Sequence, residues 1–239
     1  MAPHPAGLSL ESSARIAGGI WSREFADNLT GPPISRMRTG RRHITRRKGR
    51  SLLSAGGGAA YVLAIMGSFD IRKGVLSDFA KIERLYPDAF PNEELRPLVR
   101  ALLRNIPDVL SLVAIAESTL IGHVIFTPCG VAGGSNAVAL LGPLAVATAW
   151  QKHGVGNALV RAGLDRLRAA DFDQVFVLGD PAYYERFGFE AELSVAPPFP
   201  LPDEWRETWQ SITLRSTESR LRGTLSVPQA WNDPNLWAP

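Results

Sequence analysis

The sequence predicts an α/β (α+β) fold, a mixed, mostly antiparallel central sheet with helices on both faces. Three observations favour it. Strand-like and helix-like segments follow one another in the order β-α-α-β-β-β-α-β-α-β-β, which is typical of a sheet covered by helices. Two of the strands are joined by a short turn near Ser118 and so form an antiparallel hairpin. The apolar run DQVFVLG, after an amphipathic helix, suits a buried parallel strand.

The first elements are a strand over Phe69–Lys73 and two helices. In VLSDFAKIERLYPDAF the apolar residues recur at helical spacing, and Ser77 is expected to cap the helix. The second helix is expected over Glu93–Arg104, where four apolar residues share one face. The hairpin strands LSLVAIAE and TLIGHVIFTPCGV follow.

The second half of the domain begins with a long strand over Ala137–Thr148, interrupted by Gly142-Pro143. Because proline has no amide hydrogen for a ladder, we expect a bulge or kink there. The amphipathic helix and the strand DQVFVLG come next, and PAYYERFGF predicts a short helix that ends at Gly188. Further strands are expected near Ala191–Val195, Ser211–Leu214 and Gly223–Ser226.

Composition and charge narrow the function classes. The hydrophobic fraction of 45% is that of an ordinary globular protein. Residues 1–66 carry a net charge of +7 and the remainder −4, so the basic character of the whole chain says little about nucleic-acid binding by the folded part. We expect neither nucleic acid nor membrane as a required partner. The four histidines show no metal-ligand spacing, so no metal is expected.

The single cysteine, Cys129, excludes an internal disulfide and is compatible with a reducing cytoplasm, where we place the protein. As a nucleophile it would need a histidine and an acid beside it, and no such partnership is visible in the sequence.

The N-terminal segment differs from the rest. Residues 1–65 form a basic extension that we expect to be disordered, and residues 66–239 form the folded domain. Arg36–Arg50 contains eight basic residues and no acid, so it cannot bury enough apolar area to offset its conformational entropy. It is a disordered tail, an extension upstream of a true start at Met66, or an arm that binds RNA or DNA. The uncharged stretch Ser51–Phe69 leaves a secretory signal or anchor open.

The corner QKHGVG, before the amphipathic helix, is the strongest local signal. A helix N-terminus leaves its first amides unpaired and carries partial positive charge. Gly154 and Gly156 remove the Cβ atoms that would keep a ligand from these amides, so the corner suits a phosphate or pyrophosphate, unless it is only a tight turn. A Walker A loop is absent, and Leu159 stands where the dinucleotide motif needs Gly or Ala.

Two motifs together carry a family resemblance. Gln151-Lys152-His153-Gly154-Val155-Gly156 resembles the Q/R-x-x-G-x-G/A signature of the GCN5-related N-acetyltransferases (GNAT), and YYERFGF resembles the family's Tyr-x-x-x-Gly-Phe motif. With GHVIF and GPLAV, the domain is similar to the YhbS-like subgroup from about Ser68 to the C-terminus. The resemblance implies the GNAT-like acyl-CoA acyltransferase fold. It also implies an N-acetyltransferase that moves the acetyl group of acetyl-CoA, its co-substrate, to a primary amine of a small molecule or peptide by direct attack.

The resemblance also assigns a donor site. The corner amides would hold the pyrophosphate of acetyl-CoA, and the backbone of the bulged strand would bind the pantetheine arm. The residues expected to bind the donor are Leu144, Val146, Gln151, Lys152, His153, Gly154, Val155, Gly156, Asn157 and Ala158.

By the same resemblance, Tyr184 stands where the family places its general acid. A phenol suits this role, since a group with a pKa of about 10 can protonate the leaving thiolate. Glu117, at a strand end, is the predicted general base, with His123 as the alternative. Each could instead be a packing or surface residue, and Tyr183 is taken as structural. Asp180 stands where many relatives carry Asn, which leaves its role open.

Two alternatives to this enzyme remain: a non-catalytic acyl-CoA-binding or regulatory module, and an acyltransferase acting on aminoacyl-tRNA through Arg36–Arg50. The acceptor pocket is expected beside the first two helices and the loop near Phe90–Leu95. No motif identifies the acceptor itself, and a homodimer through the C-terminal strand stays open.

Overall fold

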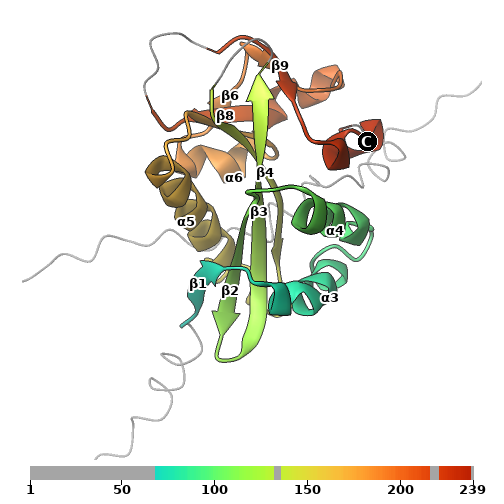
Figure 1. Cartoon of the computed structure of the whole chain (residues 1–239), viewed down its shortest axis with the longest axis vertical. Helices are drawn as coiled ribbons and strands as arrows, with labels where there is room; N and C mark the ends of the chain where they lie inside the picture. The colour runs from blue at the N-terminus through green and yellow to red at the C-terminus, as the bar shows by residue number, and fades with distance from the viewer. Residues whose placement is uncertain (1–67, 132–135, 216–220, 238–239) are drawn as a thin grey trace, which may run out of the picture.

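The computed structural model describes residues 68–131, 136–215 and 221–237. The sheet runs in the order β1-β2-β3-β4-β5-β8-β6, while β9 pairs with β3 and with β7 off this path (Figure 1). Among these described pairs, β4–β5 and β7–β9 are parallel and the others antiparallel. The predicted mixed, mostly antiparallel sheet with helices on both faces is therefore confirmed. The alternatives for residues 1–65 lie outside the described residues.

The first half holds β1 (Asp70–Lys73), the 3₁₀ turn η2 (Leu76–Asp78), α3 (Phe79–Ala89), α4 (Arg96–Asn105), β2 (Leu110–Ala116) and β3 (Thr119–Val131). The prediction that Ser77 caps the first helix is wrong. Asp78 is the N-cap residue of α3, and its carboxylate serves the preceding turn η2: it accepts the amide of Val75 at 2.9 Å and is held by Arg72.

The second helix begins at Arg96, so the prediction that it starts at Glu93 is also wrong. Pro97 fits this later start, because proline lacks an amide hydrogen and is favoured in the first turn of a helix. Starting at Glu93 would place Pro97 in the second turn. Glu93 and Glu94 therefore belong to the loop between α3 and α4.

The second half holds β4 (Val138–Val146), η3 (Thr148–Trp150), α5 (Val155–Ala169), β5 (Gln174–Leu178), α6 (Pro181–Tyr184), η4 (Glu185–Phe187), β6 (Glu190–Ala191), β7 (Val195–Ala196), η5 (Asp203–Thr208), β8 (Trp209–Thr213), β9 (Gly223–Ser226), η6 (Gln229–Trp231) and η7 (Pro234–Leu236). The predicted bulge is present, since the β3–β4 register shifts between Val124 and Phe126, opposite Gly142-Pro143. The strand expected near 191–195 is two short strands instead.

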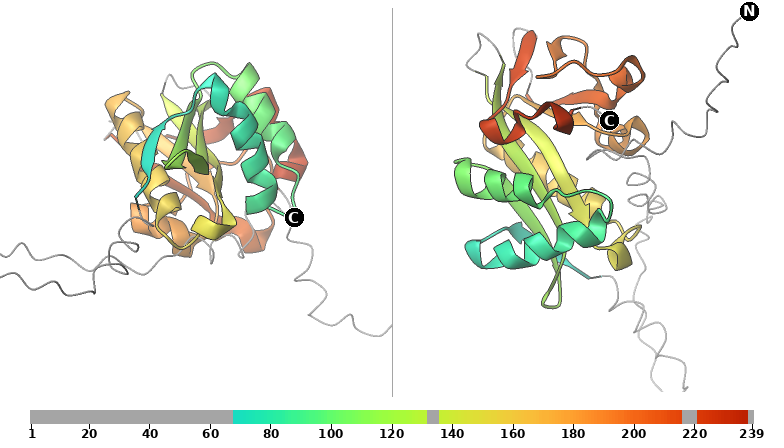
Figure 2. Two further views of the ribbon diagram at one scale, coloured as in Figure 1. Left: turned by 90° about the horizontal axis from the view of Figure 1, so that it is seen from below. Right: turned by 90° about the vertical axis from the view of Figure 1, so that its right-hand side faces the viewer.

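The two sides of the sheet carry different layers, as Figure 2 shows. On one side, called here the α5 face, α5 and α6 pack on the sheet through Leu159, Leu164 and Tyr184. Gly122 on β3 permits this close approach, because a Cβ there would stand 2.8 Å from Val155 and 2.9 Å from Leu159. On the other side, the α3/α4 face, both helices pack on the sheet with the C-terminal Trp231 and Trp237.

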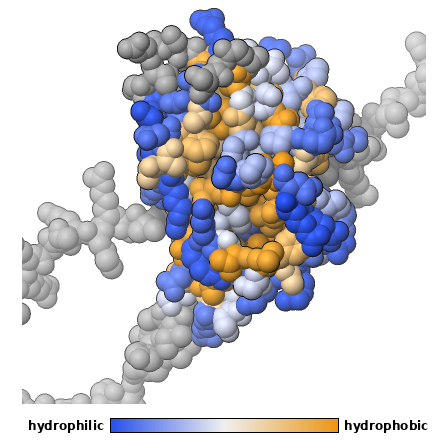
Figure 3. All heavy atoms as spheres, in the orientation of Figure 1, coloured by the Kyte–Doolittle hydropathy of each residue, from blue (hydrophilic) through white to orange (hydrophobic). Residues whose placement is uncertain are grey.

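The surface has both hydrophobic and hydrophilic regions. In the space-filling view, hydrophobic surface lies between regions of hydrophilic side chains over the two helical layers (Figure 3). Within the described residues, no helix is both long and apolar enough to span a membrane. The same residues contain no group of three or more His, Cys, Asp or Glu side chains arranged to hold a metal ion.

Candidate active site

An opening between β4 and β5 defines the candidate site. The two parallel strands pair only over Val138–Gln174, Ala139–Val175 and Leu140–Phe176, although β4 continues to Val146. The rest of β4 keeps β3 on its other side. Its edge toward β5 therefore carries backbone amides and carbonyls that form no ladder. Leu144 and Val146, predicted to bind the donor, lie in this stretch.

The corner stands at the end of this opening. Lys152 and Gly154 adopt the left-handed conformation, with φ of 62° and 81°. A Cβ added to Gly154 would meet nothing within 4 Å, so the space in front of it is open. The first helical bond of α5 runs from the Ala158 amide to the Gly154 carbonyl at 3.0 Å. The amides before it have no carbonyl one turn earlier, so they are left free at the corner where the sequence predicts an anion site.

Side chains of the corner fold back on it. The Gln151 amide group donates to the Val146 carbonyl at 3.2 Å, which ties the corner to the end of β4. His153 Nδ1 donates to the Gln151 carbonyl at 2.7 Å, and its ring stands edge-on to Trp150. The side-chain oxygen of Asn157 is buried and has no hydrogen-bond partner among the described residues. The structure thus brings all of the predicted donor-binding residues to one end of β4.

Tyr184 is placed beside the end of β5. The carboxylate of Asp180 caps α6 by accepting the Ala182 amide at 2.9 Å, and the chain turns at Gly188 with φ of 92°. The Tyr184 ring lies against Gly179, where a Cβ would collide with it. Burial and, to a lesser extent, the negative charge of Asp180 raise the pKa of Tyr184 above its ordinary value. The phenol is therefore protonated at neutral pH and able to donate.

Tyr183, the neighbour taken as structural, is also buried, and its ring stands edge-on to that of Tyr184 at 4.9 Å between centroids. Its hydroxyl has no hydrogen-bond partner among the described residues. The guanidinium of Arg186 lies over its ring at 4.9 Å.

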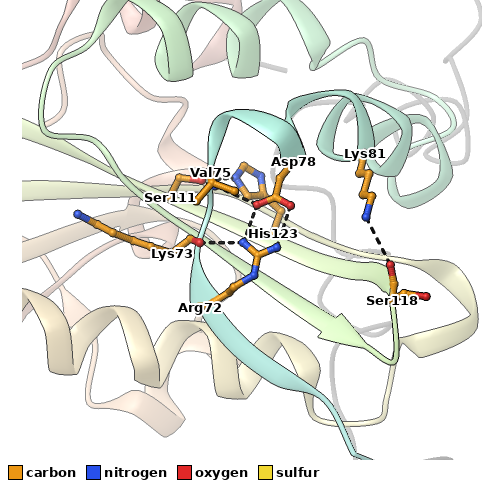
Figure 4. A network of polar contacts seen from close by, with 8 residues as sticks. All are labelled: Arg72, Lys73, Val75, Asp78, Lys81, Ser111, Ser118 and His123. Carbon is orange, nitrogen blue, oxygen red and sulfur yellow. Dashed lines mark hydrogen bonds and ion pairs between the residues drawn. The ribbon is translucent and has the colours of Figure 1, made fainter.

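His123 lies in a closed network on the α3/α4 face (Figure 4). Its Nδ1 is 2.9 Å from the Tyr86 hydroxyl and its Nε2 is 2.9 Å from the Ser111 hydroxyl. The side chain is fully buried, and burial lowers its pKa to about 3. Both ring nitrogens already have partners, so His123 has no free nitrogen for a proton from an acceptor.

Glu117 occupies the tight turn between β2 and β3, with φ of 54° and an exposed side chain. In the sheet order, β4 separates this hairpin from β5, against whose end Tyr184 packs. The structure therefore does not bring Glu117 and Tyr184 into one cluster. The Cys129 thiol is no better placed as a nucleophile, because burial raises its pKa to about 12.

Glu93 is the titratable residue that sequence reasoning missed. Its Oε2 is buried without a hydrogen-bond partner among the described residues, and burial raises the pKa of this carboxyl to about 7. One signal in the sequence is Pro97, which favours a helix that starts after Glu93 and so leaves Glu93 in the loop. Nothing in the sequence indicates that the loop buries it.

Comparison with known proteins shows which family has this fold and sequence. Residues 79–189 match the family described as Acetyltransferase (GNAT) family. The chain is 34% identical over 154 residues to the uncharacterized N-acetyltransferase YjhQ of Escherichia coli K12, covering 62% of this chain and 85% of YjhQ. The chain belongs to the GNAT family. Among its relatives, the uncharacterized N-acetyltransferase YhbS of Escherichia coli K12 is 36% identical over 121 residues, covering 50% of this chain and 72% of YhbS.

Solved structures agree with this membership. A GNAT family acetyltransferase from Brucella melitensis, in complex with acetyl-CoA, is 29% identical with a TM-score of 0.58, covering 70% of this chain and 99% of that one. Escherichia coli YhbS in complex with CoA is 28% identical with a TM-score of 0.62, covering 69% and 92%. The predicted GNAT fold is confirmed, and this GNAT protein is an acetyl-CoA-dependent N-acetyltransferase.

Proposed function

We propose that the protein transfers the acetyl group of acetyl-CoA to a primary amine of a small molecule or peptide by direct attack on the thioester. One observation carries this proposal: the opening between β4 and β5 has unpaired amides at the start of α5 at one end and a buried, protonated phenol beside the end of β5. A donor bridging the two would have its phosphates and its sulfur at the two places that suit them.

The donor is proposed to bind mainly to backbone. The amides between Gln151 and Ala158, which lie before the first helical bond of α5, surround the pyrophosphate, where the positive end of α5 favours negative charge. The open space at Gly154 lets phosphate oxygens approach the chain closely. The unladdered groups of Leu144 and Val146 bond the amides of the pantetheine arm, and the buried oxygen of Asn157 is a further acceptor for such an amide.

In the transfer itself, Tyr184 is proposed to protonate the departing thiolate of CoA. Holding the amine and thioester in line supplies much of the acceleration, and proton donation adds roughly 10²–10⁴-fold. The acceptor must also lose a proton before or during attack. Glu117 stays a prediction for that role, weakened by its exposed position in a turn.

The test is a thiol-release assay of the full chain with acetyl-CoA and a panel of amino acids, polyamines, aminoglycosides and peptides. We expect thiol release that depends on one class of amine, with the acetylated product identified by mass spectrometry. CoA binding without turnover across the panel would support the non-catalytic module instead. Acetylation confined to aminoacyl-tRNA would support the tRNA-directed alternative.

A further inference from the structure

The loop between α3 and α4 holds Glu93 in a fixed place. Phe90 and Leu95 on either side of it are both buried, and the Glu93 amide donates to the Phe90 carbonyl at 3.3 Å in a tight turn. Phe90 in turn stacks on Tyr86 of α3 at 6.0 Å. The Glu93 carboxylate is thus carried by a short, anchored segment.

Two contacts place this loop at the opening between β4 and β5. The Asp88 carboxylate at the end of α3 accepts the Thr148 amide at 2.8 Å, and the Asp88 carbonyl accepts the Thr148 hydroxyl at 2.9 Å. Thr148 lies just after the end of β4. In addition, Phe90 and Leu95 pack in one hydrophobic cluster with Ala145 of β4 and Leu178, the last residue of β5.

The opening is therefore approached from its two sides by different groups. Tyr184 packs on the α5 face, against the residue that follows β5. The loop with Glu93 lies on the α3/α4 face and follows Asp88, which is bonded to Thr148 just past the end of β4. In Figure 2 the layer of α3 and α4 stands across the sheet from α5. A thioester held between β4 and β5 would have the phenol on one side and Glu93 on the other.

Among the described residues, Glu93 has no ion-pair partner. Its charged neighbours do have partners: Glu94 pairs with Arg96, Arg100 pairs with Glu83, and the Asp88 carboxylate accepts the Thr148 amide. Desolvation is the cause of the raised pKa of Glu93. A buried, unpartnered carboxylate oxygen costs free energy that a cation or hydrogen-bond donor would recover. An alkylammonium group has the matching charge and donors.

We propose that Glu93 receives the acceptor: its carboxylate pairs with the ammonium group of the incoming amine and then removes a proton from it. This inference rests on the proposed function and names the base for it. One N–H bond of the ammonium breaks and its proton passes to Oε2 of Glu93. The freed nitrogen lone pair forms the bond to the acetyl carbon, and the C–S bond breaks. The thiolate takes its proton from the Tyr184 hydroxyl, and the second N–H proton, lost as the amide forms, restores that hydroxyl.

The experiment compares Glu93→Gln with Glu94→Gln in the full chain. Glu94 is the matched control, because it is the adjacent residue and its exposed carboxylate pairs with Arg96. With spermidine or the best amine of the panel, Glu93→Gln should lower kcat by roughly 10²-fold, leaving acetyl-CoA affinity unchanged. The wild-type kcat/KM should rise with pH as a group with a pKa near 7 loses its proton, and this rise should be absent in Glu93→Gln. Glu94→Gln should keep the wild-type kcat and the wild-type rise of kcat/KM with pH.

Hydroxylamine separates a base from a merely structural residue. It is mostly uncharged at neutral pH, so its attack needs no carboxylate to take a proton first. We expect Glu93→Gln to lose far less activity with hydroxylamine than with spermidine. An equal loss with both, or an unchanged rate and pH profile with spermidine, would overturn the role of Glu93.

A carbon-13 NMR titration of the Glu93 carboxyl gives a reading independent of turnover. We expect a pKa near 7 in the wild-type chain. An ordinary acidic value would overturn the inference even if the enzyme is active. Absence of turnover by wild type with every amine would overturn the proposed function, and this inference with it. Turnover that Glu93→Gln leaves intact would overturn only the inference.

Discussion

The two faces of the sheet handle charge in different ways. On the α5 face, the groups near the opening are backbone amides at the start of α5 and the neutral phenol of Tyr184. On the α3/α4 face, the corresponding group is the carboxyl of Glu93, whose pKa burial raises to about 7. Backbone amides cannot change charge, so they suit a donor that is the same in every cycle. Titratable side chains suit an acceptor that must lose a proton.

Within the α3/α4 face, the same comparison separates two buried titratable groups. His123 has a hydroxyl on each ring nitrogen, and burial keeps it neutral. Glu93 has a buried oxygen with no partner among the described residues. Buried polar groups in folded proteins are nearly always hydrogen-bonded. We therefore assign a structural role to His123, which has its partners, and a ligand-binding role to Glu93, which lacks one. Four substitutions on the two faces of the sheet test the comparison between them.

The largest effect is expected at the donor corner. Gly154→Glu puts a negative side chain into the open space where the pyrophosphate is proposed to sit, in a left-handed conformation that glycine favours. Acetyl-CoA binding should fall below detection by calorimetry. Gly130→Glu on β3, where a Cβ would meet only Ser226 at 3.9 Å, is the control and should bind normally. Unchanged affinity in folded Gly154→Glu would reject the corner as the anion site.

The next effect is on stability in acid. The unfolded chain protonates His123 near pH 6.5, whereas the folded chain resists until about pH 3. The unfolded state therefore binds more protons between these values, so stability falls as pH falls through this window. From pH 7 to pH 4 His123 alone should remove about 3 kcal/mol from the free energy of unfolding. Denaturant titrations at both pH values should show a smaller acid loss in His123→Gln, although that variant is less stable at pH 7.

Tyr184→Phe should act on chemistry and little else. The ring keeps its packing against Gly179, so stability should change by less than about 1.5 kcal/mol, the net worth of one hydrogen bond. Single-turnover rates should fall roughly 10²-fold. They are the measurement to use, because steady-state rates would hide the effect if product release limits turnover. Wild-type single-turnover rates in the variant would show that another group protonates the thiolate.

Tyr183→Phe is the matched control for Tyr184 and the smallest expected effect. Its hydroxyl is buried without a partner among the described residues, so removing it should leave stability unchanged or raised by up to about 1 kcal/mol. Turnover should stay near the wild-type value. A loss of turnover comparable to that of Tyr184→Phe would mean that the two hydroxyls act together.

Sequence reasoning located the α5 face well and the α3/α4 face poorly. The corner and the bulge depend on the local backbone conformation. Gly154 permits the left-handed turn and Pro143 interrupts the strand ladder, so both are visible in the sequence. Tyr184 was singled out by the resemblance of YYERFGF to the Tyr-x-x-x-Gly-Phe motif, and its catalytic role stays a prediction. His123 and Glu93 depend instead on tertiary contacts. The partners of His123 are Tyr86 and Ser111, which lie 37 and 12 residues away along the chain. Glu93 stands out because its buried carboxylate oxygen has no hydrogen-bond partner among the described residues.

The early end of the β4–β5 pairing has a consequence for how the protein melts. Because β4 beyond Leu140 lacks β5 as a ladder partner, the centre of the sheet holds backbone groups that a bound donor can pair with. A donor paired there binds the folded chain and not the unfolded one. The melting temperature should therefore climb with acetyl-CoA concentration, and amide hydrogen exchange should slow at Leu144 and Val146 before any acceptor is known. The cofactor would then be, in thermodynamic terms, part of the fold.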